Sequence, residues 1–311
     1  MKKSANLHGL LATALLCVAS GSPSHAATTV FVSGQPGAND TNACTLASPC
    51  RSIGHATGVA GNGGTVSCLD AGPYAETFTA TTSFTLDCEG VVHDLVNNNP
   101  AITVQTANAP VVRFRHVIFD GANGGSSAGA VLISSGSNVV FEDCTFQNFP
   151  GAGVEFTPSA AGAHLTITDS IIANNGTGVE ILPVQAAKAT AMIERTQITG
   201  NGNGITADSA GGAVLVDVRY SSVASNAMFG ISAVGFGSVA SIVVDHGAVD
   251  HNGTGISAGG SLGFVSLNDS TVDWNATGLT TASGGLIISY QDNLIAGNPS
   301  PGVTPLGIGR Q

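Results

Sequence analysis

The sequence has few charged residues, and basic residues are the scarcest. Only 9% of the 311 residues are charged, well below the ~25% of an ordinary soluble domain. Lys and Arg number 9 against 20 Asp and Glu, for a formal net charge of -11. A chain without a basic surplus cannot neutralise a phosphate backbone, so we expect no nucleic-acid partner. The near absence of lysine also argues against a helix-rich protein.

Several motifs of familiar chemistry are missing as well. The chain has no C-x-x-C pair, no P-loop, no G-x-G-x-x-G that opens a helix, and no G-x-S-x-G. Its histidines lack the spacing of metal ligands. We therefore expect neither a metal nor another cofactor. Apolar residues still make up 43% of the chain, which is enough material for a core.

Residues 1–26 have the layout of a secretory signal peptide. Two lysines precede an apolar run over 10–19, and Ser24-His25-Ala26 is typical of a cleavage site. The run is shorter than the ~20 residues that cross a bilayer, and no later run reaches that length. The prediction is a secreted or periplasmic protein, cleaved after Ala26, without a transmembrane segment.

A repeat of 23 to 26 residues fills the second half of the chain. Each copy has an asparagine, an aliphatic residue three positions earlier, and in the first five copies a Gly-aliphatic pair shortly afterwards. The asparagines are Asn175, Asn201, Asn226, Asn252, Asn275 and Asn298. Between them apolar residues alternate, as in Leu165-x-Ile167, and this period of two with β-branched residues indicates short strands.

One such copy cannot bury its apolar side alone, whereas stacked copies form a continuous core. We therefore predict an all-β fold, a single-stranded right-handed parallel β-helix of about ten coils over 65–298, with a coil spacing of ~4.8 Å. The repeated asparagines, Asn175 to Asn275, would stack and satisfy backbone groups at a bend. Residues 27–64 are predicted to form a strand, a loop and a short capping helix. Residues 299–311 are predicted to be a Pro/Gly-rich tail.

Five cysteines follow the signal peptide, and an oxidising compartment favours disulfides. Cys44 and Cys50 bracket a short loop, and Cys68 and Cys88 lie roughly one coil apart, so each pair could bond. Four cysteines still allow three pairings, and Cys144 adds more. Cys144 falls in a small inward column of the repeat, where a buried and inert thiol is expected.

The N-terminal segment resembles that of the pectin-lyase-like right-handed β-helix superfamily. The resemblance rests on a predicted short helix, then Gly63-Gly64-Thr65-Val66, a strand and Gly72-Pro73-Tyr74. With the asparagine-bearing coils it covers most of 28–298. A narrower likeness, to a group of secreted bacterial β-helix proteins, rests on Phe31-Val32-Ser33-Gly34, Cys44, Pro49-Cys50-Arg51, Gly63-Gly64 and Cys68-Leu69-Asp70. Both likenesses imply the fold, and neither implies an activity, because the superfamily includes lyases, hydrolases, esterases and adhesins.

One group of residues combines acids with an aromatic ring. Asp250 and Asp273 fall in the same repeat column, so they should lie about 5 Å apart on adjacent coils. That is the carboxyl spacing of retaining glycosidases, which makes both residues catalytic candidates. His251 and Trp274 follow them, and Asp245 and His246 lie on the coil of Asp250; these four are ligand-binding candidates. Turns also favour Asp, and a lone Trp more often packs than binds, so a structural role stays open.

Two functions remain for this chain. The first is a non-catalytic secreted β-helix that binds a carbohydrate or another cell-envelope or extracellular partner. The alternative is a polysaccharide lyase or glycoside hydrolase. The known lyase, polygalacturonase and esterase signatures of the superfamily are missing, and the coils over 165–298 are nearly equal in length, leaving little sequence to wall a cleft. Both observations favour the first function, and the oligomeric state stays open.

Overall fold

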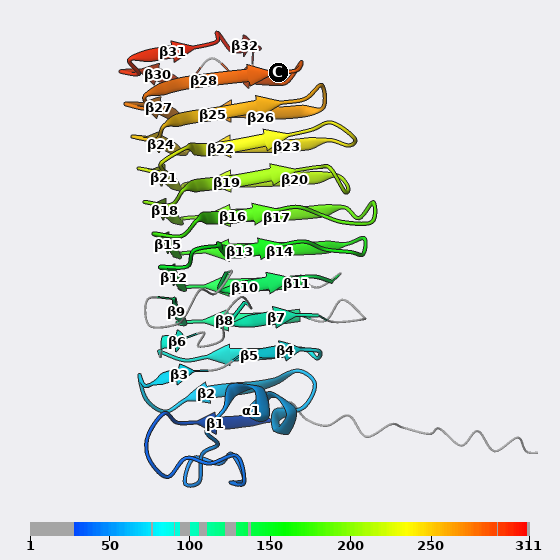
Figure 1. Ribbon diagram of the computed structural model, residues 1–311, viewed down its shortest axis with the longest axis vertical. Coiled ribbons are helices and arrows are strands. Elements are labelled where there is room, and N and C mark those ends of the chain that lie inside the picture. The colour runs from blue at the N-terminus through cyan, green and yellow to red at the C-terminus, as the bar shows by residue number, and fades with distance from the viewer. Residues whose placement is uncertain are drawn as a thin grey trace, which may run out of the picture.

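The protein is a long stack of short parallel strands wound about one axis, as the computed structural model shows (Figure 1). The structure describes residues 28–75, 77–89, 91–93, 100–105, 111–121, 129–135, 138–290 and 292–309. The expected signal peptide, 1–26, lies outside these residues. Each coil passes through three sheets in turn, here called sheets 1, 2 and 3.

Within the described residues, sheet 1 has twelve strands and sheets 2 and 3 have ten each. Sheet 1 comprises β1 (Thr29–Val32), β2 (Gly64–Cys68), β5 (Phe84–Asp87), β8 (Val111–Arg115), β11 (Asn138–Glu142), β14 (Ala163–Thr168), β17 (Ala189–Glu194), β20 (Val214–Arg219), β23 (Ala240–Asp245), β26 (Gly263–Asn268), β29 (Leu286–Ser289) and β32 (Leu306–Gly307). Sheet 2 comprises β3 (Pro73–Ala75), β6 (Val91–His93), β9 (Ile118–Asp120), β12 (Thr145–Gln147), β15 (Ile171–Ala173), β18 (Gln197–Thr199), β21 (Ser222–Ala224), β24 (Ala248–Asp250), β27 (Thr271–Asp273) and β30 (Leu294–Ala296). Sheet 3 comprises β4 (Phe78–Ala80), β7 (Ile102–Val104), β10 (Val131–Ile133), β13 (Ala152–Phe156), β16 (Thr177–Ile181), β19 (Asn203–Asp208), β22 (Phe229–Val234), β25 (Thr254–Gly259), β28 (Thr277–Ala282) and β31 (Ser300–Gly302).

The core is a set of files in which like residues stack from coil to coil. Ile193 of β17 is the register partner of Ile167 on one side and of Val218 on the other, and all three are fully buried. Nearer the N-terminus the files contain phenylalanine, and the Phe119 and Phe146 rings stack with centroids 4.8 Å apart. Because alternate side chains of every strand point inward, the period of two in the sequence becomes one continuous core. The predicted all-β parallel β-helix is confirmed, although its number of coils differs slightly from the expected ten.

The repeated asparagines form a buried column at the corner between sheets 2 and 3. The backbone N–H and side-chain Nδ2 of Asn175 both donate to Oδ1 of Asn201, at 2.9 and 3.1 Å. Nδ2 of Asn175 also donates to the carbonyl of Phe146, one coil back, at 3.1 Å. The same bonds repeat along the column through Asn201, Asn226, Asn252, Asn275 and Asn298. The column therefore satisfies backbone groups that the bend removes from the sheets.

A glycine three or four residues after each of the first five asparagines is required by close approach of the next coil. A Cβ atom on Gly204 would lie 2.4 Å from the carbonyl oxygen of Gly230 and 2.7 Å from Cγ1 of Val223. Real Cβ atoms do not approach this closely, so only glycine lets the coils stack at this corner.

From β16 to β26, the corner between sheets 3 and 1 absorbs most of the variation in coil length. It spans 182–188 between β16 and β17, but only 260–262 between β25 and β26. The asparagine spacing falls from 26 to 23 residues over the same coils, and the strands stay in register.

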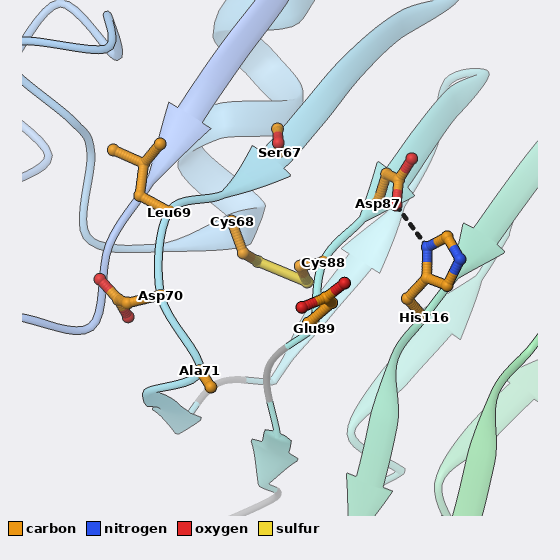
Figure 2. Close-up of a pocket in the computed structure, with 9 residues that line it drawn as sticks. All are labelled: Ser67, Cys68, Leu69, Asp70, Ala71, Asp87, Cys88, Glu89 and His116. Atoms are coloured by element: carbon orange, nitrogen blue, oxygen red, sulfur yellow. Dashed lines mark hydrogen bonds and ion pairs between the residues drawn. A yellow bond between two sulfur atoms is a disulfide. The ribbon is translucent and has the colours of Figure 1, made fainter.

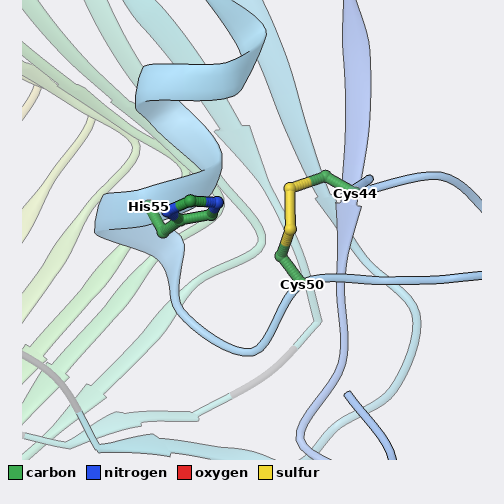
Figure 3. A group of neighbouring side chains, drawn as sticks. All are labelled: Cys44, Cys50 and His55. Carbon is green, nitrogen blue, oxygen red and sulfur yellow. A yellow bond between two sulfur atoms is a disulfide. The ribbon is translucent and has the colours of Figure 1, made fainter. Parts of the chain in front are cut away.

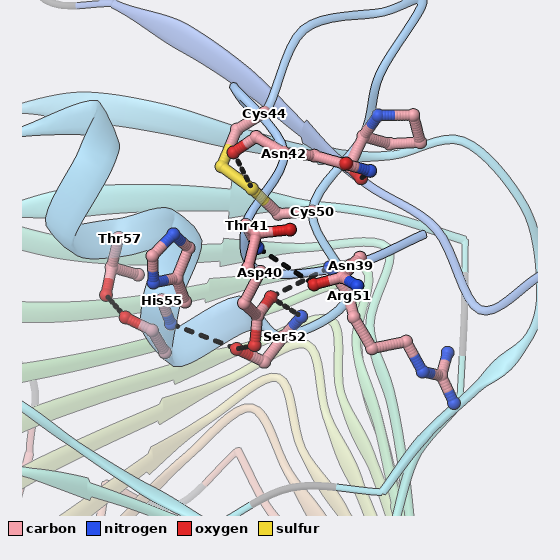
Figure 4. Close-up of a disulfide and its surroundings, with 12 residues drawn as sticks. Asn39, Asp40, Thr41, Asn42, Cys44, Cys50, Arg51, Ser52, His55 and Thr57 are labelled. Carbon is pink, nitrogen blue, oxygen red and sulfur yellow. Dashed lines mark hydrogen bonds between the residues drawn. A yellow bond between two sulfur atoms is a disulfide. The ribbon is translucent and has the colours of Figure 1, made fainter. Parts of the chain in front are cut away.

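The N-terminal end is covered by α1 (Ile53–Ala60), and the predicted capping helix is confirmed (Figure 1). Ile53, Ala56 and Ala60 of α1 are buried, because they face the core. Oγ of Ser52 accepts a hydrogen bond from the N–H of His55 at 3.3 Å and so caps the helix. Asp40 holds this end in place by accepting from the backbone N–H groups of Arg51 and Ser52, both at 2.9 Å (Figure 4). Burial opposes ionisation of Asp40, but these hydrogen bonds outweigh it and lower the pKa of the carboxyl.

Asp70 joins the first strand to the segment that follows the second. Its carboxylate accepts hydrogen bonds from the backbone N–H groups of Gly34 and Gly72 at 3.0 and 3.2 Å, and from the hydroxyl of Tyr74 at 3.1 Å. The Ser33 hydroxyl donates to the second carboxylate oxygen. Burial raises the pKa of Asp70, but these four donors outweigh it and hold the pKa below its usual value. Five of the residues that carried the resemblance thus form one hydrogen-bonded joint: Ser33, Gly34, Asp70, Gly72 and Tyr74.

Two disulfides cross-link the N-terminal end of the β-helix. Cys44 bonds to Cys50 within the loop before α1, and Cys68 bonds to Cys88 across adjacent coils, with Cα atoms 4.6 Å apart in each pair. The sequence allowed three pairings of these four cysteines, and the structure has the one in which each cysteine bonds to the partner considered for it from the sequence. Cys144 is free and buried, and burial raises the pKa of its thiol to about 12.

The C-terminal segment differs from the prediction of a tail over 299–311. Ser300–Gly302 pairs with β28, and Leu306–Gly307 pairs with β29, so the last coil continues into this segment. Pro301 is compatible with β31 because that strand lies at the edge of sheet 3, where a missing N–H interrupts no further ladder. In the described part of the chain, no helix has the length and hydropathy needed to cross a membrane.

Candidate functional site

The two candidate carboxylates lie on neighbouring strands of sheet 2. Asp250 ends β24, Asp273 ends β27, and the two residues are register partners. Both side chains are half-buried and point away from the core, because the inward position is taken by Val249 and Val272. Adjacent strands lie about 4.8 Å apart. Both carboxylates therefore point into solvent on the same side of sheet 2, close enough together to contact one sugar residue.

His251 and Trp274 lie directly after these acids, at the corner that leads to sheet 3. Both have left-handed backbones, with φ of 55° and 54°, and this geometry turns their side chains outward. Nδ1 of His251 lies 2.8 Å from Oδ1 of Asp250. The Trp274 side chain is exposed, at 62% of its full accessible surface. We call Asp250, His251, Asp273 and Trp274 the Trp274 patch.

The Trp274 ring rests on the backbone of the next coil. A Cβ atom on Gly297 would lie 3.3 Å from Cε2 and 3.4 Å from Cδ2 of Trp274, so the ring lies against the bare glycine. One side of the indole is thereby supported, and more than half of the side chain stays open to solvent. An aromatic ring held in this way can receive the apolar side of a sugar ring.

Asp245 and His246, predicted to lie near Asp250, are separated from it by the length of β24. They lie at the corner between sheets 1 and 2, where the strands of sheet 2 begin, whereas the Trp274 patch lies where those strands end. There His246 bridges two acids, with Nδ1 2.9 Å from Asp245 and Nε2 3.1 Å from Asp269. Hydrogen bonds from the Asn268 amide and from His246 outweigh burial and lower the pKa of Asp245. The five residues that follow Asp245, up to Asp250, include the whole of β24, so one acid lies before that strand begins and the other lies at its end.

A groove that the sequence did not predict crosses sheet 3, and it encloses about 260 Å³. It runs over β16, β19 and β22, with Glu180 and Asp208 among its walls. Apolar residues, including Phe229 and the exposed Met228, share the rest of the surface with the polar residues Thr177, Asn203, Thr206 and Ser232. Oδ1 of Asn203, which also lines the groove, is buried and has no hydrogen-bond partner among the described residues. We call this feature the acidic groove.

The acids of sheet 3 lie close enough to repel one another. Glu155 on β13 is the register partner of Glu180 on β16, and Asp208 lies one strand further, displaced diagonally by two residues. Burial raises the pKa of Glu155 and the Glu180 charge raises it further; burial and the Asp208 charge do the same for Glu180. A signal for this pair was present in the sequence, because both glutamates follow a Gly-Val pair, at 153–154 and 178–179.

A larger pocket of about 350 Å³ lies at the N-terminal end beside the Cys68–Cys88 disulfide (Figure 2). Three of its polar side chains, those of Asp70, Asp87 and His116, already have partners. Asp70 belongs to the joint described above, and Asp87 lies 2.8 Å from Nδ1 of His116. This contact outweighs the effect of burial and raises the pKa of His116. The pocket is thus lined by three acids, Asp70, Asp87 and Glu89, and by one histidine, which contacts Asp87.

Cys44, Cys50 and His55 lie close enough together to resemble a metal site (Figure 3). The two sulfurs are bonded to each other, so neither offers the thiolate that a metal requires. His55 is then the single remaining ligand of this group, and one imidazole does not make a zinc site.

Comparisons with known proteins identify the fold. The family described as "Right handed beta helix region" matches residues 83–217 and 129–299. A comparison with curated proteins finds no match. Among solved structures, the A-module of mannuronan C-5 epimerase AlgE4 from Azotobacter vinelandii is 17% identical, with a TM-score of 0.50, covering 88% of this chain and 97% of that one. Pectate lyase Pel9A is 15% identical, with a TM-score of 0.49, covering 89% of this chain and 78% of that one.

Sequence identities this low show a shared fold and nothing finer. The family match is different, because it spans well over half of the residues, from the third coil to the last asparagine of the column. The stacked coils, the asparagine column and this match agree. The chain belongs to the right-handed β-helix family.

Proposed function

We propose that the protein binds a polysaccharide on the outer surface of its β-helix without cleaving it, and that the Trp274 patch makes the main contact. The observation that carries this proposal is the exposed Trp274 ring, supported on Gly297 and placed directly after Asp273. The ring offers a platform for the apolar side of a sugar. The register-paired carboxylates of Asp250 and Asp273 offer acceptors for its hydroxyl groups.

The shape of the coils supports binding over cleavage. From β14 onward the connections between sheets 1, 2 and 3 are short, and in this part of the chain no long loop stands beside the Trp274 patch. An open surface does not exclude water from a reacting bond, as catalytic clefts do. We further propose that the protein acts in a periplasmic or extracellular compartment, because two disulfides persist best in oxidising surroundings.

The test is a glycan array probed with the wild type and with Trp274→Asn. Asparagine tolerates the left-handed backbone at this position, so the change removes the ring and keeps the corner. The matched control is Tyr220→Asn, which removes another exposed aromatic ring at a left-handed corner. We expect Trp274→Asn to weaken binding at least tenfold and Tyr220→Asn to leave it unchanged. Equal effects of both variants, or no glycan bound by the wild type, would refute the proposal.

The second candidate function is glycoside hydrolysis or polysaccharide lysis, favoured by one observation. The two carboxylates of the Trp274 patch are register partners, and a separation of about 5 Å is that of retaining glycosidases. Reducing-sugar and unsaturated-product assays on a polysaccharide panel decide between the functions. Product release by the wild type that is lost in Asp250→Asn and Asp273→Asn would establish catalysis in place of binding alone.

A further inference from the structure

We propose that the acidic groove binds an amine-bearing sugar residue, so that the polysaccharide recognised by this protein is a glucosamine-type polymer with free amino groups. This inference rests on the proposed polysaccharide binding and adds a second contact on sheet 3. It is carried by the groove's lack of positive charge, by the kinds of polar atom that line it, and by its apolar walls.

The charge of the groove is uncompensated. Glu180 and Asp208 line it, Glu155 lies one coil away, and none of the lining residues is basic. Neither Glu155 nor Glu180 has a hydrogen-bond or ion-pair partner among the described residues. Half-buried carboxylates that repel one another favour any ligand that brings a positive charge between them. A uronic-acid polymer would add to the repulsion instead.

The polar atoms of the groove call for a donor. Ionised Glu180 and Asp208 only accept hydrogen bonds. An ammonium group is a pure donor with a positive charge, so it matches both carboxylates. Thr206 and Ser232 are register partners that line the groove, and their hydroxyls can donate hydrogen bonds to sugar hydroxyls or accept hydrogen bonds from them.

The walls of the groove distinguish a sugar from a bare cation. A metal ion such as Ca²⁺ prefers six to eight oxygen ligands and gains nothing from apolar neighbours. Here Met228 is 53% exposed, and Phe229 and Val234 also line the cavity, so the ligand must present apolar surface as well as charge. The C–H face of a pyranose ring carrying an amine has both properties.

The groove and the Trp274 patch border the same sheet. Trp274 lies in the corner that leads into β28, and in the order of sheet 3 only β25 separates β28 from β22 at the groove. A linear polymer that follows the helix axis can therefore contact both. Each coil adds about 4.8 Å, so a few sugar residues cover the distance.

Isothermal titration calorimetry with the glucosamine tetramer, below the pKa of its amines, tests this inference. The N-acetylated tetramer is the uncharged control ligand, and tetralysine is the cationic control without a sugar. We expect the glucosamine tetramer to bind at least tenfold more tightly than either control. Glu180→Gln and Asp208→Asn should each weaken its binding at least tenfold. Asp143→Asn, which removes an exposed acid at the corner between sheets 1 and 2, away from sheet 3, should have no effect.

Three results would overturn the inference: equal binding of the acetylated tetramer, equal binding of tetralysine, or full affinity in both groove variants. Calcium binding that Glu180→Gln abolishes, without saccharide binding, would overturn it too. These failures are distinct from failure of the proposed function. If only the groove is assigned wrongly, the wild type still binds some glycan and Trp274→Asn still weakens that binding. If the proposed function is wrong, either no glycan binds or Trp274→Asn weakens binding no more than Tyr220→Asn.

Discussion

Asn201 donates both its backbone N–H and its side-chain Nδ2 to a single atom, Oδ1 of Asn226, at 3.0 and 3.1 Å. In the same way, its own Oδ1 accepts both donors of Asn175. Each of the four inner asparagines, Asn201, Asn226, Asn252 and Asn275, is thus bonded to an asparagine on both sides, in the buried interior. Hydrogen bonds in such a setting are costly to lose, because the remaining partners stay buried and unsatisfied.

Replacing Asn201 with alanine should therefore destabilise the protein by about 2–5 kcal/mol. The change leaves both N–H donors of Asn175 and the carbonyl of Ile172 buried without a hydrogen-bond partner. Urea unfolding followed by circular dichroism measures the change. Gln197→Ala, an exposed change on the same coil, is the control and should stay within about 0.5 kcal/mol of the wild type. A midpoint for Asn201→Ala equal to that of the control would contradict this account of the column.

Gly204→Ala should also destabilise the protein, by about 1–3 kcal/mol or more, because the new Cβ would collide with the carbonyl of Gly230. The matched change is Gly259→Ala. There a Cβ would meet only Cγ2 of Val234, at 3.9 Å, and the backbone is not left-handed. Alanine at 259 should be neutral or stabilising, by about 0.4–1 kcal/mol, through the unfolded chain. Thermal unfolding of the two variants would show opposite shifts, and shifts of the same sign would argue against close approach as the reason for the glycine column.

The Asp70 joint predicts a defined loss of stability in acid. The folded-state pKa of Asp70 is lower than its unfolded value of about 4, so folding favours the ionised form. Its contribution is complete above the unfolded pKa and is lost as the pH falls through the folded pKa. Asp70→Asn should cost about 1–3 kcal/mol at pH 7, and the difference from the wild type should shrink in acid, where the wild-type carboxyl is protonated too. Urea midpoints at both ends of this range measure it, and a difference that does not change with pH would count against the joint.

Glu180 should behave in the opposite way. Its folded-state pKa is raised by burial and by Asp208, so the folded form favours the protonated carboxyl. Stability is highest below the unfolded pKa and falls as the pH rises through the folded pKa. Glu180→Gln should consequently raise the unfolding midpoint at neutral pH. Glu142→Gln, which removes an acid paired with Arg113 and Arg115, should not raise it. A lower midpoint for Glu180→Gln would mean that this carboxylate has a partner that stabilises it.

The fold could be predicted because its repeated columns follow from local chemistry. Asn175 and its equivalents must satisfy a bend, and the glycine near each must admit the next coil, so both leave a periodic trace in the sequence. The strands of the last coil left no such trace. β31 and β32 are short edge strands rich in Pro and Gly, and their pairing comes from the preceding coil rather than from their own residues.

The candidate site could be predicted only in part, because outward side chains are under weaker constraint. The register of Asp250 and Asp273 follows from the asparagine column, and the structure places them together. The separation of Asp245 from Asp250 depends on where one sheet ends and the next begins, and a five-residue interval does not reveal this. The acidic groove was missed because Glu155 and Glu180 lie in a column dominated by hydroxyl residues further along, at Thr206 and Ser232.

The unequal corners between sheets 3 and 1 have a consequence for engineering. The asparagine column fixes the corner between sheets 2 and 3, so residues added at the exposed positions 184–186 should lengthen one coil without shifting any strand. Loop extensions at an exposed corner cost little free energy. A foreign peptide grafted there would project sideways from a rigid rod, and grafts on successive coils would be displayed at regular intervals of about 4.8 Å.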